Sequence, residues 1–413
     1  MDFNPQPPSI MHIDLNSCFA TIEQQANPFL RGKPIVVAAF DSPKGCILAA
    51  SVEAKRQGIK TGMRVIEGRK INSKLIVLTP DPWKYRCVHL AIKKVVSDYT
   101  DDFLPKSIDE FVLNLKERPC LRGRSIYDVG REIKQRIKTE VGEYLTVSMG
   151  ISTNKYLAKV ASNIKKPDGL EEINKNNFLS VYSKLKLTDL MGIKKANAKR
   201  LNSMGIYSVS DFYNAPLWRL KASFHSITSL YWYERLRGYE VDSFIPKRGS
   251  YGNSVAIGKS VVSFDEISPI LCNLVEKMAR RLRVAGYKAC GVYLALFYKN
   301  GSFWHKGKSF ESPISSSKDF FKRATTLLKE TSCKLAVRNI AVSAFNLIKT
   351  NSLQLEIFED VEKKDNLTNA VDEINEKWGD FVIRPAVILK SKQNILDRIA
   401  FGGVKELEEL TFS

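Results

Sequence analysis

Residues 11–20 read MHIDLNSCFA and residues 106–115 read KSIDEFVLNL, so that Asp14, Asp109 and Glu110 each stand in or beside an apolar run. Burying an isolated carboxylate costs roughly several kcal/mol unless a partner balances its charge. Three carboxylates that converge at the ends of buried strands therefore predict a bound cation. Magnesium prefers carboxylate oxygens and is usually bound beside phosphate groups, so it is the ion that we expect.

The charge of the chain limits the class of partner. The chain has 413 residues, 44% of them hydrophobic, which is enough for two or more separate cores, so we expect a globular multidomain protein. Its formal net charge is +20. Residues 351–413 contain 8 Lys and Arg against 13 Asp and Glu, a net charge of −5, so residues 1–350 carry +25. Such a basic body favours a nucleic acid as partner, with an anionic membrane surface as the alternative.

Neither a membrane span nor a secretory signal is expected. No apolar run approaches the roughly 20 residues that cross a bilayer, and no Lys or Arg precedes Arg31. The seven cysteines include no CxxC pair and lie mainly in apolar stretches, so reduced buried thiols are favoured over zinc ligands or disulfides. We therefore expect a cytoplasmic protein.

Strands and helices are predicted to alternate around the carboxylates, followed by a helical region and a linker. The predicted strands span 10–15, 34–39, 45–50, 75–78 and 145–151, with one more that holds SIDE at 107–110. The predicted helices span 52–57, 85–99 and an amphipathic segment at 126–137, residues 173–245 are mostly helical in pattern, and the basic stretch 241–252 indicates a linker.

A separate small domain is predicted beyond this linker. Apolar alternation and helical periodicity between residues 255 and 347 predict the order βαββαβ, a four-stranded sheet with two helices on one face. Residues 251–350 contain 16 Lys and Arg against 6 Asp and Glu, a net charge of +10. An open basic face on this sheet would follow a phosphate backbone, and the alternative is a solvated charged surface.

Several motifs resemble those of the Y-family, or translesion, DNA polymerases of bacteria, most closely the polymerase IV type. The resemblance covers nearly the whole chain and keeps the family's order of motifs. These motifs are DLNSCFATIE at 14–23, SIDEF at 107–111, GISTNKYLAKVASNIKKPDG at 150–169, the helix-hairpin-helix MGIKKANAKRLNSMGI at 191–206, AVRNIAVSAFNL at 336–347 and DRIAFG at 397–402.

The resemblance implies an α+β, multidomain, right-hand polymerase. It would have a palm on a βαββαβ-type sheet, small fingers, a helical thumb and a βαββαβ little finger. The implied limits are 1–27 and 78–172 for the palm, 28–77 for the fingers, 173–240 for the thumb with its helix-hairpin-helix, 241–252 for the linker, 253–350 for the little finger and 351–413 for an acidic tail.

The activity implied by the resemblance is template-directed, error-prone addition of dNTPs to a primer 3′ end by two-metal nucleotidyl transfer, for DNA damage tolerance and repair. By resemblance, Asp14 and Asp109 are shared ligands of two Mg²⁺ ions, for which Mn²⁺ can substitute. Glu110 would bind the ion nearest the primer end, and the Leu15 carbonyl would complete the nucleotide-side site.

The resemblance also implies nucleotide and DNA contacts. The backbone N–H groups of Ser17 and Cys18 would cradle phosphate oxygens, with Lys55 and Lys166 as side-chain cations. Phe19 would be the steric gate that excludes a 2′-hydroxyl, and the alternative is a core phenylalanine. The expected DNA-binding residues are Gly192, Lys194 and Lys195 in the hairpin motif, and Lys259 and Arg338 in the little finger.

Some residues depart from the family pattern. Val52 and Lys55 stand where Tyr and Arg are usual, and the surrounding GCILAASVEAK is more like the polymerase V catalytic subunit, so the subgroup stays open. Asn16 replaces a common aspartate. Lys194 replaces the second glycine of the hairpin, so the thumb is expected to grip DNA through Lys194 or Lys195, or more weakly.

The acidic tail contains a peptide, QLEIF at 354–358, that resembles the one with which bacterial polymerases dock on the sliding clamp. Its expected contact residues are Gln354, Leu355, Ile357 and Phe358, and the alternative is that Leu355 and Phe358 pack on the domain. The partners implied are therefore primer-template DNA, dNTPs and the clamp, with no membrane, and we expect a monomer.

Two other function classes stay open. A nucleotidyl cyclase would share a two-metal palm but would not need the hairpin motif or the basic βαββαβ domain. A catalytically degenerate DNA-binding relative would be expected to lose a carboxylate, and all three are present.

Overall fold

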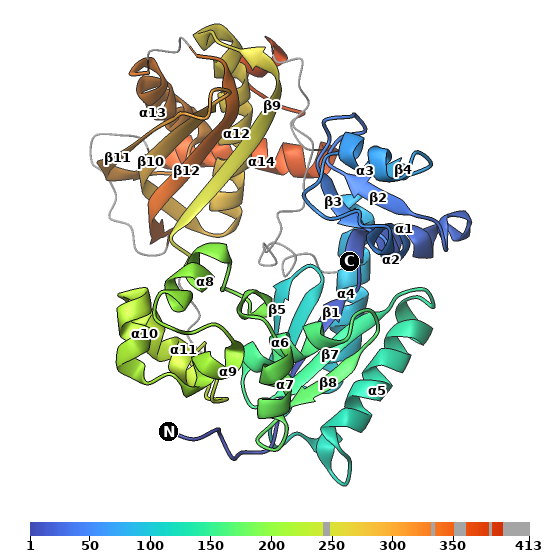
Figure 1. The fold of residues 1–413 in the computed structure, drawn as a ribbon. Helices are drawn as coiled ribbons and strands as arrows, with labels where there is room; N and C mark the ends of the chain where they lie inside the picture. The colour runs from blue at the N-terminus through green and yellow to red at the C-terminus, as the bar shows by residue number, and fades with distance from the viewer. Residues whose placement is uncertain (243–247, 332–334, 351–360, 380–381, 391–413) are drawn as a thin grey trace. The chain divides into compact units, whose positions relative to one another are not determined.

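The computed structural model of the chain describes residues 1–242, 248–331, 335–350, 361–379 and 382–390. The described residues form two compact units, the first within residues 1–242 and the second within residues 248–390 (Figure 1).

A five-stranded sheet of order β5-β6-β1-β7-β8 forms the middle of the first unit (Figure 1). Its central strand β1 (Ile10–Leu15) is buried along its whole length. Met11, Ile13 and Leu15 belong to the main hydrophobic core, so the alternation of the strand turns His12 and Asp14 to the opposite face. The other strands of this sheet are β5 (Phe103–Ser107), β6 (Glu110–Asn114), β7 (Val147–Ser152) and β8 (Leu170–Ile173).

The helix α6 (Lys155–Ile164) approaches β7 closely because of a glycine. A Cβ on Gly150 of β7 would lie 2.0 Å from the Ala158 carbonyl oxygen and 2.2 Å from the Ser162 backbone nitrogen. Only a residue without a side chain fits there, so α6 rests on the backbone of the sheet. The remaining helices around the sheet are α1 (Cys18–Ala26), α4 (Pro82–Ser97) and α5 (Ile126–Arg136), which continues as the π-helix η3 (Ile137–Val141).

The segment SIDE is a hairpin rather than part of one strand, which corrects the prediction. β5 ends at Ser107 and β6 begins at Glu110, and these two residues are paired, so Ile108 and Asp109 form a two-residue turn. The register of the next pair places Glu110 directly opposite Asp14. Two carboxylates adjacent in sequence therefore occupy different positions, Asp109 on the turn and Glu110 on the sheet.

A smaller sheet of order β3-β2-β4 follows β1 and α1 in the chain and precedes β5. It has a hydrophobic core of its own. The predicted strands and the basic helix of this region are confirmed, with ends that differ by one or two residues. The elements are β2 (Ile35–Ala38), β3 (Ile47–Ala50), α2 (Val52–Arg56), α3 (Val65–Ile71) and β4 (Ile76–Leu78), after the 3-10 helix η1 (Pro28–Leu30).

Residues beyond β8 are helical, as the pattern predicts. Five short helices pack around a third core that includes Leu201, Phe212 and Trp232. They are α7 (Phe178–Lys184), α8 (Lys195–Asn202), α9 (Val209–Asn214), α10 (Leu217–Phe224) and α11 (Thr228–Arg235).

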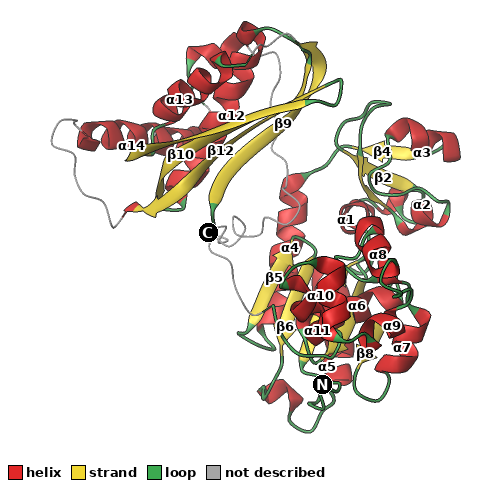
Figure 2. Ribbon diagram, turned by 60° about the vertical axis from the view of Figure 1, so that its left-hand side comes forward, coloured by secondary structure: helices red, strands yellow, loops and turns green. Residues whose placement is uncertain are grey.

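The second unit has the predicted βαββαβ order and a four-stranded sheet of order β11-β10-β12-β9. α12 and α13 cover one face of this sheet (Figure 2). The first strand begins at Ser250, so residues 250–252 belong to the sheet and not to the expected linker. The elements are β9 (Ser250–Val261), α12 (Phe264–Val284), β10 (Tyr287–Tyr298), β11 (Phe303–Ile314), α13 (Ser317–Lys329) and β12 (Val337–Lys349), followed by α14 (Val361–Trp378) and the 3-10 helix η6 (Ala386–Lys390).

The middle of the open face of this sheet is neutral, which corrects the expectation of a basic face. Leu294 and Leu296 point into the core under the helices, so their neighbours in β10 point outward. Phe297 and Phe303 are directly opposite each other there and are 47% and 60% exposed. The register adds Tyr293, Ala295, His305, Gly307, Asn339, Ala341, Ser343, Gly252, Ser254 and Ala256 to this face. None of these twelve positions carries a positive side chain, so the charge of the unit lies elsewhere.

Candidate active site

One pocket of the first unit contains the residues expected at a nucleotidyl-transfer site. Its volume is about 650 Å³. Its walls come from the end of β1, the start of α1, the strand β3, the helix α2, the turn before β6, the helix α6 and the loop after α6. The expected residues that line it are Asp14, Leu15, Ser17, Cys18, Phe19, Lys55, Asp109, Glu110 and Lys166, together with Asn16, Val52, Arg56 and Lys159.

The junction of β1 and α1 shapes the floor of this pocket. Asp14 is the penultimate residue of β1 and is only 6% exposed. Ser17, the residue before α1, has a left-handed backbone with φ of 52°. This turn directs the N-terminus of α1, which begins at Cys18, toward the same pocket as Asp14. A helix N-terminus favours anions, as the expected phosphate-binding role of Ser17 and Cys18 requires.

Two lysines balance the charge of Asp14 and Glu110. The Lys159 ammonium lies 2.5 Å from Asp14 Oδ2 and 2.6 Å from Glu110 Oε1, and the Lys166 ammonium lies 2.6 Å from Asp14 Oδ1. Burial alone would lower the pKa of Lys159, but the charges of Asp14 and Glu110 outweigh burial and raise it. Burial would likewise raise the pKa of Glu110, but His12 and Lys159 outweigh it and lower the pKa to about 2.

His12 completes the surroundings of Glu110 on the face of β1 that α6 covers. Its Nε2 lies 3.6 Å from Glu110 Oε2, and the side chain is 3% exposed. Burial lowers the pKa of His12, so the imidazole is neutral near pH 7. Its Nδ1 is buried and finds no hydrogen-bond partner among the described residues.

Asp109 has a different environment from its two neighbours. Burial raises the pKa of Asp109, and the negative charges of Asp14 and Glu110 raise it further, while Ser107 Oγ donates a hydrogen bond to Asp109 Oδ1 at 2.5 Å. The three carboxylates therefore repel one another across the pocket. Such repulsion falls when cations bind between them.

The donor set of the pocket fits divalent cations. Within the residues that the structure describes, no three Asp, Glu, His or Cys side chains gather closely enough to hold an ion as they stand. Asp14 and Glu110 nevertheless hold one cation between them already, the Lys159 ammonium. Carboxylate oxygens are the ligands that magnesium prefers, so these residues could hold Mg²⁺ in the pocket.

The residues expected at the nucleotide lie on the other walls. The Lys55 ammonium donates a hydrogen bond to Ser17 Oγ at 2.8 Å, and burial followed by the charge of Lys166 lowers the pKa of Lys55. Phe19 is 3% exposed and stacks on Tyr85, with ring centroids 4.3 Å apart. Phe19 thus packs in the core and also lines the pocket.

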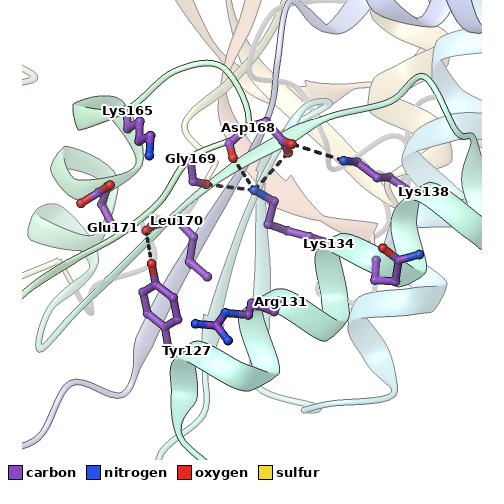
Figure 3. Close-up of a pocket in the computed structure, with 10 residues that line it drawn as sticks. Tyr127, Arg131, Lys134, Lys138, Lys165, Asp168, Gly169, Leu170 and Glu171 are labelled. Atoms are coloured by element: carbon purple, nitrogen blue, oxygen red, sulfur yellow. Dashed lines mark hydrogen bonds and ion pairs between the residues drawn. The ribbon is translucent and has the colours of Figure 1, made fainter.

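The loop that carries Lys166 contributes to two pockets, the active-site pocket and a second one of about 400 Å³. Figure 3 shows the residues that line the second pocket. Lys166 and Pro167 line the first pocket, whereas Lys165 and Asp168 line the second. The Lys134 ammonium donates to the Asp168 carbonyl oxygen at 2.5 Å and lies 3.0 Å from Asp168 Oδ1 (Figure 3). The helix α5 therefore ties down this loop.

The expected DNA-binding residues are spread over both units. Lys194 and Lys195 are exposed at the N-terminus of α8, and Gly192 before them has a left-handed φ of 94°. Arg338 is exposed at an irregularity of β12, next to the residue that pairs with Phe297. Lys259 lies in β9, but its side chain is outside the described residues, as is the peptide of Gln354, Leu355, Ile357 and Phe358.

Sequence reasoning missed Lys159, His12 and Tyr85. Lys159 carried the clearest signal, since it stands in the run YLAKVA, where the neighbouring side chains are all apolar. A lysine on the buried face of a helix needs a negative partner. Tyr85 gave no comparable signal, because an aromatic residue in an amphipathic helix is usual.

Comparisons with known proteins cover both units. Residues 13–163 match the model of the impB/mucB/samB family, and residues 248–357 match the model of its C-terminal domain. The DNA polymerase IV of Moorella thermoacetica is 32% identical over 390 residues, which are 92% of this chain and 96% of the relative. The DNA polymerase IV of Bacillus velezensis is 28% identical over 394 residues, 93% of this chain and 94% of the relative.

Solved structures show the same fold. The Y-family DNA polymerase chimera Dbh-Dpo4(243-245)-Dbh has a TM-score of 0.73 and 25% identity, and the match covers 82% of this chain and 99% of that one. An insertion ternary complex of Dbh DNA polymerase has a TM-score of 0.57 and 24% identity with the same coverage. With both parts of the family model matched and a relative 32% identical over nearly the whole chain, the protein belongs to the Y-family of translesion DNA polymerases, of the polymerase IV type.

Proposed function

We propose that the chain is a template-directed DNA polymerase of the error-prone translesion type, which adds dNTPs to a primer 3′ end. The observation that carries this proposal is the single pocket in which Asp14, Asp109 and Glu110 face Lys55 and Lys166. Carboxylates to hold cations and lysines to hold phosphates are the two sets of groups that nucleotidyl transfer needs. Membership of the family supports the same activity.

Each side chain has a role in this proposal. Asp14, Asp109, Glu110 and the Leu15 carbonyl would hold two Mg²⁺ ions, which when bound lower the pKa of the primer 3′-hydroxyl and stabilise the leaving pyrophosphate. Lys55 and Lys166 line the same pocket as Asp14 and would balance the triphosphate charge. Phe19, backed by Tyr85, would meet the sugar of the nucleotide and exclude a 2′-hydroxyl.

The expected domains are part of the proposal. The five-stranded sheet would be the palm, the small three-stranded sheet the fingers, the helices α7 to α11 the thumb and the second unit the little finger. The exposed Lys194 and Lys195 at the start of α8 would bind a DNA phosphate in place of the missing hairpin glycine. We further expect the protein to act as a cytoplasmic monomer. No helix in the described part of the chain is long and apolar enough to cross a bilayer.

Primer extension tests the activity. The purified chain is incubated with a primer-template, dNTPs and magnesium, on undamaged and abasic templates. We expect metal-dependent extension that Asp109→Ala abolishes. A wild-type protein that binds DNA but does not extend the primer would favour the degenerate DNA-binding relative, and conversion of a nucleoside triphosphate to a cyclic nucleotide without DNA would favour the cyclase.

A sliding clamp is the second partner that we propose. The support is the resemblance of QLEIF at 354–358 to clamp-binding peptides and its position between β12 and α14. Addition of the clamp should increase the length of the extension products made by the wild type. Phe358→Ala should remove this increase and leave extension without the clamp unchanged, whereas equal stimulation of both proteins would contradict the proposal.

A further inference from the structure

We propose that Lys159 is an internal counter-ion that occupies the place of the catalytic metal in the metal-free protein, so that ion binding must displace its ammonium from Asp14 and Glu110. This inference rests on the proposed function of these carboxylates as metal ligands. Displacement of Lys159 would precede catalysis. The affinity for metal would then depend on a residue that is not itself a metal ligand.

The geometry supports displacement rather than a passive contact. The ammonium of Lys159 touches one oxygen of each carboxylate, at 2.5 Å from Asp14 Oδ2 and 2.6 Å from Glu110 Oε1. The other two oxygens also have neighbours, because Lys166 lies 2.6 Å from Asp14 Oδ1 and His12 Nε2 lies 3.6 Å from Glu110 Oε2. The ammonium of Lys159 therefore occupies the space between the two carboxylates in which a cation shared by both would bind. Lys159 itself lines the active-site pocket, so its flexible four-carbon stem can withdraw the ammonium into the pocket.

The position of Lys159 is built into the fold. Its side chain is 10% exposed, whereas that of Lys166, which also contacts Asp14, is 35% exposed. The close contact of α6 with β7 at Gly150 holds the backbone of Lys159 at a fixed height above Asp14. Lys159 therefore returns to the carboxylates whenever they carry no other cation.

The charges of the pocket predict when displacement occurs. The three carboxylates share the pocket with Lys55, Arg56, Lys159 and Lys166, so the formal charges that line the metal-free pocket sum to about +1. A first divalent ion gains little attraction from such a pocket. A bound triphosphate brings further negative charge, so we infer that ions bind tightly only together with the nucleotide.

Manganese binding to the full-length chain tests the inference without catalysis. The free Mn²⁺ signal in electron paramagnetic resonance is titrated in the absence of DNA and nucleotide. Lys159→Met keeps the apolar stem and removes the charge, and we expect it to bind Mn²⁺ about tenfold more tightly than the wild type or better, because one charge at contact distance changes binding by at least that factor. Thermal unfolding should show a correspondingly larger stabilisation by Mn²⁺ in this variant.

Two control variants separate charge from packing. Lys159→Arg keeps the positive charge and should retain the weak binding of the wild type. Lys155→Met removes a lysine one turn earlier on the same helix, outside the pocket, and should also bind like the wild type. If Lys159→Met does not fold, Lys159→Gln provides the same comparison with a neutral donor.

The outcomes distinguish the inference from the proposed function. Equal or weaker Mn²⁺ binding by Lys159→Met and Lys159→Gln overturns the inference, even if the wild type extends primers normally. Tighter binding by these variants supports it, even if the wild type fails in primer extension, in which case the proposed function fails alone.

Discussion

Lys134 should control how well the chain holds its nucleotide, although it does not line the active-site pocket. Its ammonium donates to the Asp168 carbonyl at 2.5 Å and is 3.0 Å from the Asp168 carboxylate. Hydrogen bonds to charged groups contribute about 1.5 to 3 kcal/mol each, net of solvation. The Lys134 side chain is only 16% exposed, so we expect Lys134→Met to cost about 2 kcal/mol of stability in the loop.

The functional effect should appear at Lys166, two residues before Asp168. If about half of the lost free energy is needed to restore the loop when nucleotide binds, the KM for dNTP rises about fivefold. The assay is steady-state single-nucleotide insertion, with kcat and KM measured separately. We expect KM to carry most of the change, because Lys134 does not face the reacting groups.

Lys138→Met is the matched control for this prediction. Its ammonium contacts the same Asp168 carboxylate at 3.2 Å, but its side chain is 37% exposed and an ion pair of this kind contributes about 1 kcal/mol or less. A KM that is unchanged in Lys134→Met, or raised equally in both variants, would refute the argument that the loop is held in place by Lys134.

Phe19→Ala should raise ribonucleotide incorporation in primer extension because the steric gate is lost, and Tyr85→Ala should do so to a smaller degree because Phe19 loses its stacking partner. Tyr85→Phe loses only the hydroxyl contact with Glu23 and should retain discrimination against ribonucleotides. The contacts of Glu110 with His12 and Lys159 lower its pKa from 4.5 to about 2, so they stabilise the fold by about 3 kcal/mol above pH 4.5 and lose this contribution as the pH falls toward 2. Urea unfolding should therefore separate wild type from Glu110→Gln at pH 7 and bring them together near pH 2. Gly150→Ala should cost about 3 kcal/mol or more, measured by the same method, because its Cβ meets the backbone of α6; a stable variant with unchanged metal binding would contradict the close contact.

Most of the elements that periodicity predicts are present in the structure, with the strand expected at SIDE as an exception. The alternation along β1 and the βαββαβ order of the second unit needed only the pattern of apolar residues, because each element buries one continuous face. The hairpin at Asp109 was not predictable in this way. Its turn contains Ile108 and Asp109 rather than the Asn-Gly or Gly residues that mark such turns, so the apolar pattern continues across it.

The residues of the candidate site were predictable where the side chain itself indicates a role, such as a carboxylate for a cation or a lysine for a phosphate. Asp14, Glu110, Lys55 and Lys166 were expected together, and one pocket contains them all. The ion pairs of Lys159 were not, because a sequence does not show which buried charges meet. The neutral middle of the open face of the second unit was missed for a related reason: net charge gives the total for a domain but not the face on which it lies.

The glycine contact between α6 and β7 also bears on how far a sequence of this kind can diverge. At Gly150 the helix rests on the backbone of the strand, so the spacing between them does not depend on the volume of any side chain. Apolar residues elsewhere in the core can be exchanged for others of similar size without moving the helix relative to the sheet. The junction thus concentrates a structural constraint on one position and relieves many others. Relatives that are only 28% and 32% identical over nearly the whole chain fit this picture.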